Sequence, residues 1–186
     1  MKKRLAILAL ALVTVVTVNA QSKTIKTGES TVTWKGYKVT GSHEGTVDLK
    51  SGTLKFDDSK LTGGEFVIDM TTIGATDLEG DMKGKLDGHL KSDDFFGVSN
   101  YPTAKLVITK VKSTGKNSYK VTGNLTIKKT TKPVTFDMSV YGSKATATVK
   151  IDRSEYDVRY GSGSFFDNLG DKTIYDEFDL VVDLQF

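Results

Sequence analysis

The sequence contains no cysteine. Disulfide bonds are therefore excluded, although an exported protein would meet a compartment that permits them. A diacylglycerol thioether anchor of the bacterial lipoprotein kind is excluded for the same reason, because it needs a cysteine side chain. The two histidines, His43 and His89, lie in different segments. The Cys and His ligand set of a structural zinc site is thus also missing, and we expect no metal.

An excess of charge of either sign is nearly absent once the N-terminus is set aside. The chain carries 26 basic and 23 acidic side chains, but Lys2, Lys3 and Arg4 belong to an N-terminal segment that we expect to be removed. Without these three, 23 basic and 23 acidic side chains remain in residues 21–186. This balance gives no support for a nucleic-acid partner or for electrostatic attachment to an anionic membrane.

Long apolar runs are also scarce, and the only one extends from Leu5 to Val18. It is shorter than the roughly 20 residues that a membrane-spanning helix requires. It follows three basic residues, and the small residue Ala20 offers a cleavage position. These features predict a secretory signal peptide over residues 1–20, cleaved after Ala20. We expect residues 21–186 to form one exported, soluble domain in the periplasm of a bacterium or, alternatively, outside the cell.

Motifs for catalysis are missing as well. No GxSxG nucleophile elbow occurs, and neither histidine stands in a recognisable pattern with serine and aspartate. Asp93 and Asp94 are adjacent, so their side chains diverge, and capping of a helical turn explains them better than paired-carboxylate catalysis. The glycine-containing stretch 161–163 lacks the lysine and the following helix of a phosphate-binding loop. The sequence therefore predicts no catalytic residue.

Apolar residues at alternate positions are abundant, which is typical of β-strands with one buried face. The segments that show this alternation are 119–127, 134–140, 145–151 and 178–186 and, less clearly, 32–34, 47–49, 54–56 and 66–70. The expected turns are Ser51-Gly52, Gly63-Gly64, 115–117 and 142–144. We count eight or nine strands in hairpin-like succession, which predicts an all-β antiparallel fold. The pattern alone allows a closed barrel or a two-sheet sandwich.

One segment, residues 73–102, departs from this alternation, and we call it the lid segment. Apolar residues recur there every four positions from Leu78 to Leu90, which indicates helix. Three glycines weaken this helix, each by up to about 1 kcal/mol relative to alanine, so we expect a loop and one short helix. A following turn would be capped by Ser92 or Asp93. The aromatic residues expected to cover one open end of the sheet are Phe95, Phe96 and Tyr101.

Arg153 continues the inward parity of the strand at 145–151, which would place a charge at one end of the interior. A buried charge needs a partner. We predict an ion pair with Glu44, Asp93 or Asp94 that holds the lid segment in place. The alternative is that the guanidinium contacts a polar or phosphorylated lipid head group.

Several motifs resemble those of the YceI-like family of exported lipid-binding proteins. They are, in chain order, "TWKGYKVTGSHEGTVDLKSGTLKF", "HLKSDDFFGVSNYPTAKLVIT", "YKVTGNLTIKKTTKPVTFDM", "IDRSEY" and "FFDNLGDKTIYDEFDLVVDL". The resemblance runs in register over residues 30–186. It implies an eight-stranded antiparallel, lipocalin-like barrel over residues 21–186 with a short helical lid. The interior of such a barrel holds a long apolar lipid, typically a polyisoprenoid chain or a fatty-acid-like molecule.

An eight-stranded barrel is near the size at which its interior either fills with side chains or holds one slender ligand. Each buried CH₂ group contributes about 0.8 kcal/mol, so an apolar slot can bind such a chain without any polar contact. The residues predicted to contact the ligand are Trp34, Phe66, Ile68, Met70, Leu86, Leu90, Phe95, Phe96, Leu125, Ile127, Phe136, Met138, Val149 and Arg153.

The sequence therefore predicts a periplasmic protein that carries or stores one apolar lipid. We expect no catalytic activity and no cofactor other than a bound polyisoprenoid or other long-chain lipid, and transient contact with a membrane or a membrane protein is allowed. The oligomeric state is left open. Two alternatives remain. One is an enzyme of lipid or isoprenoid-quinone metabolism that uses Arg153, His43 or His89, and the other is a structural exported domain whose barrel is fully packed.

Overall fold

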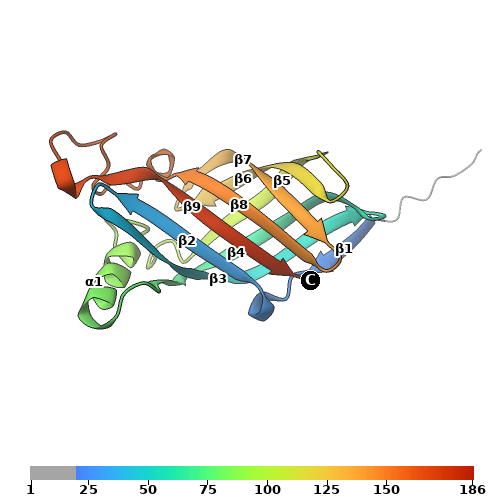
Figure 1. Cartoon of the computed structure of the whole chain (residues 1–186), viewed down its shortest axis with the longest axis horizontal. Helices are drawn as coiled ribbons and strands as arrows, with labels where there is room; N and C mark the ends of the chain where they lie inside the picture. Colours follow the sequence, from blue (N-terminus) through green and yellow to red (C-terminus); the bar gives the residue numbers. More distant parts are fainter. Residues whose placement is uncertain (1–19) are drawn as a thin grey trace, which may run out of the picture.

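The computed structural model describes residues 20–186 (Figure 1). The predicted signal peptide, apart from Ala20, lies outside the described residues. The elements are β1 (Ala20–Thr24), β2 (Thr31–Lys38), β3 (Gly41–Asp57), β4 (Lys60–Ala75), α1 (Gly80–Lys91), β5 (Thr103–Ser113), β6 (Ser118–Ile127), β7 (Thr130–Tyr141), β8 (Lys144–Asp152) and β9 (Ile174–Gln185), with short 3-10 helices at Thr27–Glu29, Arg153–Tyr156 and Gly170–Lys172. Within this described part, no helix is long and apolar enough to cross a membrane.

The strands form one closed antiparallel sheet with eight strand positions. Neighbouring strands follow the order β3-β2-β9-β8-β7-β6-β5-β4, and β3 also pairs with β4. The short β1 adds no ninth position, because it pairs with residues 53–57 of β3 while β2 pairs with residues 41–46 of the same strand. The predicted eight-stranded barrel is therefore confirmed, and the sandwich is excluded.

Alternation of apolar and polar side chains explains why these segments form strands. In β6, every second residue from Tyr119 to Ile127 is buried, whereas the residues between them are exposed or half-buried. Successive side chains of a strand point to opposite faces of the sheet, so one face of each strand lies inside the barrel. The buried residues of all the long strands form one continuous apolar cluster in the interior.

Two of the predicted turns are wrong, because Ser51-Gly52 and Gly63-Gly64 lie inside the long strands β3 and β4. The pairing of β3 with β4 shifts register between Leu49 and Ser51, which is a β-bulge. Inward residues of β3 have odd numbers before this bulge and even numbers after it. The segments 47–49 and 54–56 are therefore one strand, and the change of parity, not a turn, separates them.

Close packing explains why glycine stands at these positions. A Cβ atom on Gly52 would lie 2.8 Å from Cδ1 of Phe66, and one on Gly64 would lie 2.5 Å from the carbonyl oxygen of Thr53. Real Cβ atoms do not approach other atoms this closely. Glycine inside a strand often marks a bulge or a close approach of this kind, and here it marks both.

A β-bulge also explains why the sequence does not predict the strand β5. Its pairing with β6 shifts register between Ile108 and Lys110. The inward residues are accordingly Ala104, Leu106 and Ile108, followed by Val111. The bulge divides the strand into two stretches, each too short for its alternation to stand out.

The lid segment contains the predicted short helix, α1, which lies at one end of the barrel, opposite to β1 (Figure 1). The predicted cap of the next turn is wrong. The hydroxyl of Ser92 donates a 2.7 Å hydrogen bond to the carbonyl of His89, so it closes α1. Asp93 accepts a 3.1 Å bond from the side-chain amide of Asn100.

Candidate functional site

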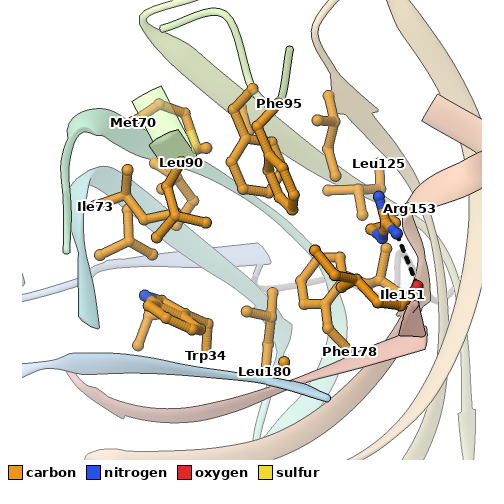
Figure 2. Close-up of a pocket in the computed structure, with 18 of the residues that line it drawn as sticks. Trp34, Met70, Ile73, Leu90, Phe95, Leu125, Ile151, Arg153, Phe178 and Leu180 are labelled. Atoms are coloured by element: carbon orange, nitrogen blue, oxygen red, sulfur yellow. Dashed lines mark hydrogen bonds between the residues drawn. The ribbon is translucent and has the colours of Figure 1, made fainter. Parts of the chain in front are cut away.

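The barrel encloses two adjoining apolar cavities. The first, of about 120 Å³, lies beneath the lid segment, and we call it the lid cavity (Figure 2). The second, of about 80 Å³, lies deeper, and we call it the deep cavity. Five residues line both cavities and separate them, namely Val32, Ile68, Leu125, Ile151 and Leu180. The interior is therefore not filled by its own side chains.

Most of the residues predicted to contact a ligand line one of these cavities. Those in the wall of the lid cavity are Trp34, Ile68, Met70, Leu90, Phe95, Phe96, Leu125, Ile127 and Arg153. Those in the wall of the deep cavity are Phe66, Ile68, Leu125, Phe136, Met138 and Val149. Leu86 lines neither cavity, because it is only partly buried against the rest of the core from its position on α1. Tyr101, expected to cover the end of the sheet, lines neither cavity either.

Sequence reasoning missed part of each wall. Many of the residues that were not predicted have the same inward parity as those that were, so the alternation could have identified them. They include Val32, Val47, Leu49, Ala147, Ile151, Leu180, Val182 and Leu184. Ile73, Ala104, Leu106, Val134 and Phe178 complete the apolar set. No sequence signal pointed to Gly36, Ile174 and Tyr175, which line the lid cavity where the pairing of β2 and β9 becomes irregular.

This irregularity brings the lid cavity to the surface. Gly36 pairs with Phe178 and Lys38 pairs with Ile174, so three residues of β9 lie opposite Tyr37 alone. Tyr175 lines the lid cavity and is nevertheless 52 % exposed. Gly36 follows Val32 and Trp34 on the inward face of β2, and a Cβ atom there would meet nothing within 4 Å. The lid cavity therefore comes nearest to the surface at Tyr175, beside the irregular pairing of β2 with β9.

Arg153 is buried in the wall of the lid cavity, with 2 % of its surface exposed. Its Nε donates to the carbonyl of Tyr175 at 3.1 Å, and its Nη1 donates to those of Val158 and Tyr160 at 2.9 Å each. Its Nη2 donates to the carbonyl of Ile174 at 2.9 Å. Four of the five N–H donors of the guanidinium are therefore bonded to backbone carbonyls.

The predicted ionic partners of Arg153 are wrong. The carboxylate at ion-pair distance is Asp176, with 3.4 Å between Nη2 and Oδ1. Burial lowers the pKa of Arg153, and Asp176 and Asp152 counteract that shift. The link to the lid segment is instead a cation–π contact, because the guanidinium carbon lies 5.4 Å from the ring centroid of Phe95.

The lid segment is held at both ends of α1. Lys83, near its start, donates to the carbonyl of Ala75 at 2.7 Å, and Asp87, one turn further along, accepts from the amide of Ala75 at 2.7 Å. Near its end, the ring of His89 packs edge-on against Phe95 and Tyr160, with centroid distances of 5.4 and 4.3 Å. His89 thus joins the lid segment to the loop that follows β8.

The apolar walls of the two cavities are suited to enclosing a hydrocarbon. Neither histidine lines a cavity, since His43 is paired with Asp77 at 2.9 Å and His89 is packed among aromatic rings. No group of three or more metal-ligating side chains occurs in residues 20–186. The walls consist of aliphatic and aromatic side chains together with Gly36 and Arg153.

Comparison with known proteins adds a family to this geometry. A model of the YceI-like domain matches residues 23–186. UPF0312 proteins of Pseudomonas putida strain W619 and Pseudomonas fluorescens strain SBW25 are 37 % and 36 % identical to this chain over 98 residues. Each alignment covers 53 % of this chain and 49 % of the relative. The matched part of this chain therefore spans about half the length of these curated relatives.

Solved structures share the fold. BcnA of Burkholderia cenocepacia superposes with a TM-score of 0.68 at 24 % identity, covering 86 % of this chain and 98 % of BcnA. A polyisoprenoid-binding domain of Saccharophagus degradans, implicated in plant cell wall breakdown, superposes with a TM-score of 0.58 at 13 % identity, covering 91 % and 99 %. The YceI protein of Campylobacter jejuni gives 0.54 at 17 % identity, covering 96 % and 90 %.

The position of His89 predicts a pH dependence of stability. Burial lowers the pKa of His89 below its ordinary value of 6.5, although the nearby Asp94 opposes this shift. The unfolded chain therefore takes up a proton at this residue before the folded chain does, so stability is lost as the pH falls below about 6.5. We expect the midpoint of thermal unfolding to fall between pH 7 and pH 5, and to fall less in His89→Phe.

The matched control for this measurement is His43→Gln, which removes the other histidine and should retain the contribution of His89. Equal pH dependence of the wild type and His89→Phe would contradict the prediction.

Proposed function

The chain belongs to the YceI-like family, and from this premise we propose that it binds one long apolar lipid inside its barrel and carries or stores that lipid without catalysis. The ligand is a polyisoprenoid or a fatty-acid-like chain. The compartment is the periplasm, in keeping with the signal peptide predicted over residues 1–20.

The observation that carries this proposal is the pair of adjoining cavities with walls of hydrocarbon. A slender chain that enters the lid cavity and continues into the deep cavity would be removed from water. Each CH₂ group buried in this way makes the free energy of binding more favourable by about 0.8 kcal/mol. Met70 and Met138 lie in the two walls, and methionine side chains adapt easily to an irregular neighbour. The likeness to the polyisoprenoid-binding domain of Saccharophagus degradans supports the same class of ligand.

The state of the polar side chains supports binding over catalysis. An enzyme at the barrel mouth would need Arg153, His43 or His89 free to act on a substrate. Four of the five N–H donors of Arg153 are bonded to backbone carbonyls, its Nη2 also lies 3.4 Å from Asp176, and neither histidine lines a cavity. A fully packed structural domain is disfavoured by the cavities themselves.

We further propose that the lipid is exchanged with a bilayer through the loop between β8 and β9. This loop lies at the same end of the barrel as α1 (Figure 1), and it is joined to the cavity wall by a 2.8 Å hydrogen bond from the amide of Ile174 to the carbonyl of Gly161. Phe165 and Phe166 are exposed on it. Aromatic side chains are favoured at the boundary between water and hydrocarbon, so they suit brief contact with a lipid surface.

The direct test of binding is extraction of the purified protein with organic solvent, followed by mass spectrometry. We expect a long-chain lipid in about one-to-one stoichiometry with the protein, because a single slender chain fits the two cavities. Removal of that lipid should lower the midpoint of thermal unfolding, and adding it back should restore the midpoint. Repeated absence of any lipid, together with no effect of added long-chain lipids on unfolding, would contradict the proposal.

A substitution between the two cavities should alter the length of chain that binds. Leu180 lines both cavities, whereas its neighbour Val181 is 53 % exposed on the outer face of β9. We expect Leu180→Phe to weaken the binding of long chains by about tenfold or more, because the larger ring narrows the passage to the deep cavity, while shorter chains still bind in the lid cavity. Competition binding with fatty acids of increasing length measures this.

The matched control is Val181→Phe, which adds an aromatic ring at the adjacent position but outside the barrel. It should bind chains of all lengths as the wild type does. The same loss of long-chain binding in both variants would contradict the prediction that one chain extends from the lid cavity past Leu180 into the deep cavity.

The exchange route predicts a kinetic effect without a change in affinity. Replacing Phe165 and Phe166 together by serine should slow lipid transfer between vesicles and the protein several-fold, since the loop would insert less readily into the lipid surface. Tyr141→Ser is the control, because Tyr141 is also exposed but lies near the β7–β8 turn at the other end of the barrel. Equal transfer rates for the wild type and the double variant would show that this loop is not the route.

A further inference from the structure

Gly36 is an inward-facing residue of β2 for which packing gives no reason. Glycine weakens a strand, and inside one it often marks a bulge or the close approach of another group. A Cβ atom on Gly36 would meet no atom of residues 20–186 within 4 Å, and the φ of Gly36 is not positive. The extra residues of the adjacent bulge belong to β9 and not to β2.

Other buried glycines of the strands differ from Gly36 in this respect. A Cβ atom on each of them would lie 2.8 Å or less from another atom, so only glycine fits there. They are Gly45, Gly52, Gly64 and Gly123. The space beside Gly36 is therefore not filled by the described part of the chain, and a bound molecule can approach the backbone of β2 there.

The space beside Gly36 belongs to the part of the lid cavity that comes nearest to the surface. Gly36 lines this cavity from β2, and Tyr175 lines it from the neighbouring strand β9 (Figure 1). The side chain of Tyr175 is 52 % exposed. The ring of Tyr175 thus lies between the lid cavity and the solvent.

Arg153 keeps β9 from pairing regularly with β2 at this place. In a regular strand, the carbonyls of two consecutive residues point to opposite sides, one toward each neighbouring strand. Ile174 and Tyr175 are consecutive, yet both of their carbonyls accept hydrogen bonds from Arg153. The carbonyl that would otherwise point to β2 is thus held by a buried guanidinium, so the irregular pairing is a fixed feature of the fold.

We propose that the ligand enters and leaves the lid cavity sideways, between β2 and β9, past the bare backbone at Gly36 and the ring of Tyr175. This inference rests on the proposed function, and it adds the route, which we call the side passage. The lid segment then stays in place during exchange, with its bonds to Ala75 intact. The hydrogen bond from Ile174 to Gly161 places the loop between β8 and β9 beside this route.

The test obstructs the side passage in two steps, with Gly36→Ala and Gly36→Val. Stopped-flow fluorescence follows the uptake of cis-parinaric acid, a linear fatty acid that fluoresces in apolar surroundings, and its release into an excess of oleic acid. Both rate constants should fall together, because an obstacle raises the barrier equally in the two directions. We expect a fall of about tenfold in Gly36→Val, which corresponds to about 1.4 kcal/mol, and a smaller fall in Gly36→Ala.

The affinity for cis-parinaric acid should stay the same in both Gly36 variants, since it is the ratio of the two rate constants. The midpoint of thermal unfolding should not fall, because valine suits a strand better than glycine does. Thr33→Val is the matched control, since Thr33 lies on the outer face of the same strand and its replacement should leave both rates unchanged.

The possible failures are distinguishable. If cis-parinaric acid binds and its rates are the same in the wild type and in Gly36→Val, the side passage is refuted while the binding function stands. Faster release with unchanged uptake would show that Gly36 only contacts the bound chain, which also overturns the proposal. If the wild type binds neither cis-parinaric acid nor oleic acid, the proposed function itself fails.

Two exposed tyrosines compare the side passage with a route under the lid segment. Tyr175→Ala removes the ring at the side passage, whereas Tyr160→Ala removes the ring that packs on His89 and so loosens the lid segment. We expect faster uptake and release in Tyr175→Ala and wild-type rates in Tyr160→Ala. Faster exchange in Tyr160→Ala with no change in Tyr175→Ala would overturn the proposal, even if the Gly36 variants do not fold.

Discussion

Pairing of β3 with β4 closes the sheet, and the rest of the structure depends on this closure. It fixes eight strand positions around one interior and leaves the long strands no free edge. The inward faces carry most of the buried apolar side chains, so the core and the candidate site are the same space. Because these side chains do not fill that space, the cavities follow from the architecture and the sizes of many residues together, and no single residue creates them.

The charged side chain in the cavity wall, Arg153, is bonded by the protein itself, and the rest of the wall is apolar. A charge placed in such a wall is costly unless it is well bonded. Arg153 meets this requirement through four backbone carbonyls and Asp176. His89 is kept among aromatic rings of the lid segment and of the following loop.

Much of this fold is visible in the sequence, because strand alternation reports directly which side chains face inward. The strands at 119–127 and 145–151, and most of the cavity wall, follow from parity alone. Bulges defeat this reasoning, since one extra residue reverses the parity, as it does near Ser51 in β3 and after Ile108 in β5. Contacts of side chains with backbone are also out of reach. The sequence predicts an ion pair of Arg153 with Glu44, Asp93 or Asp94, yet Arg153 lies beside Asp176 and binds carbonyls that only the folded loop brings together.

The bonds of Arg153 also determine how the loop between β8 and β9 is attached. The carbonyls of Val158 and Tyr160 lie where this loop leaves the barrel, and those of Ile174 and Tyr175 lie where it returns. One guanidinium thus joins the two ends of the loop where the loop meets the barrel. A deletion that removed Val158 and Tyr160 would leave the charge of Arg153 without these two hydrogen bonds in an apolar wall. The loop and Arg153 therefore depend on each other and have to be gained or lost together.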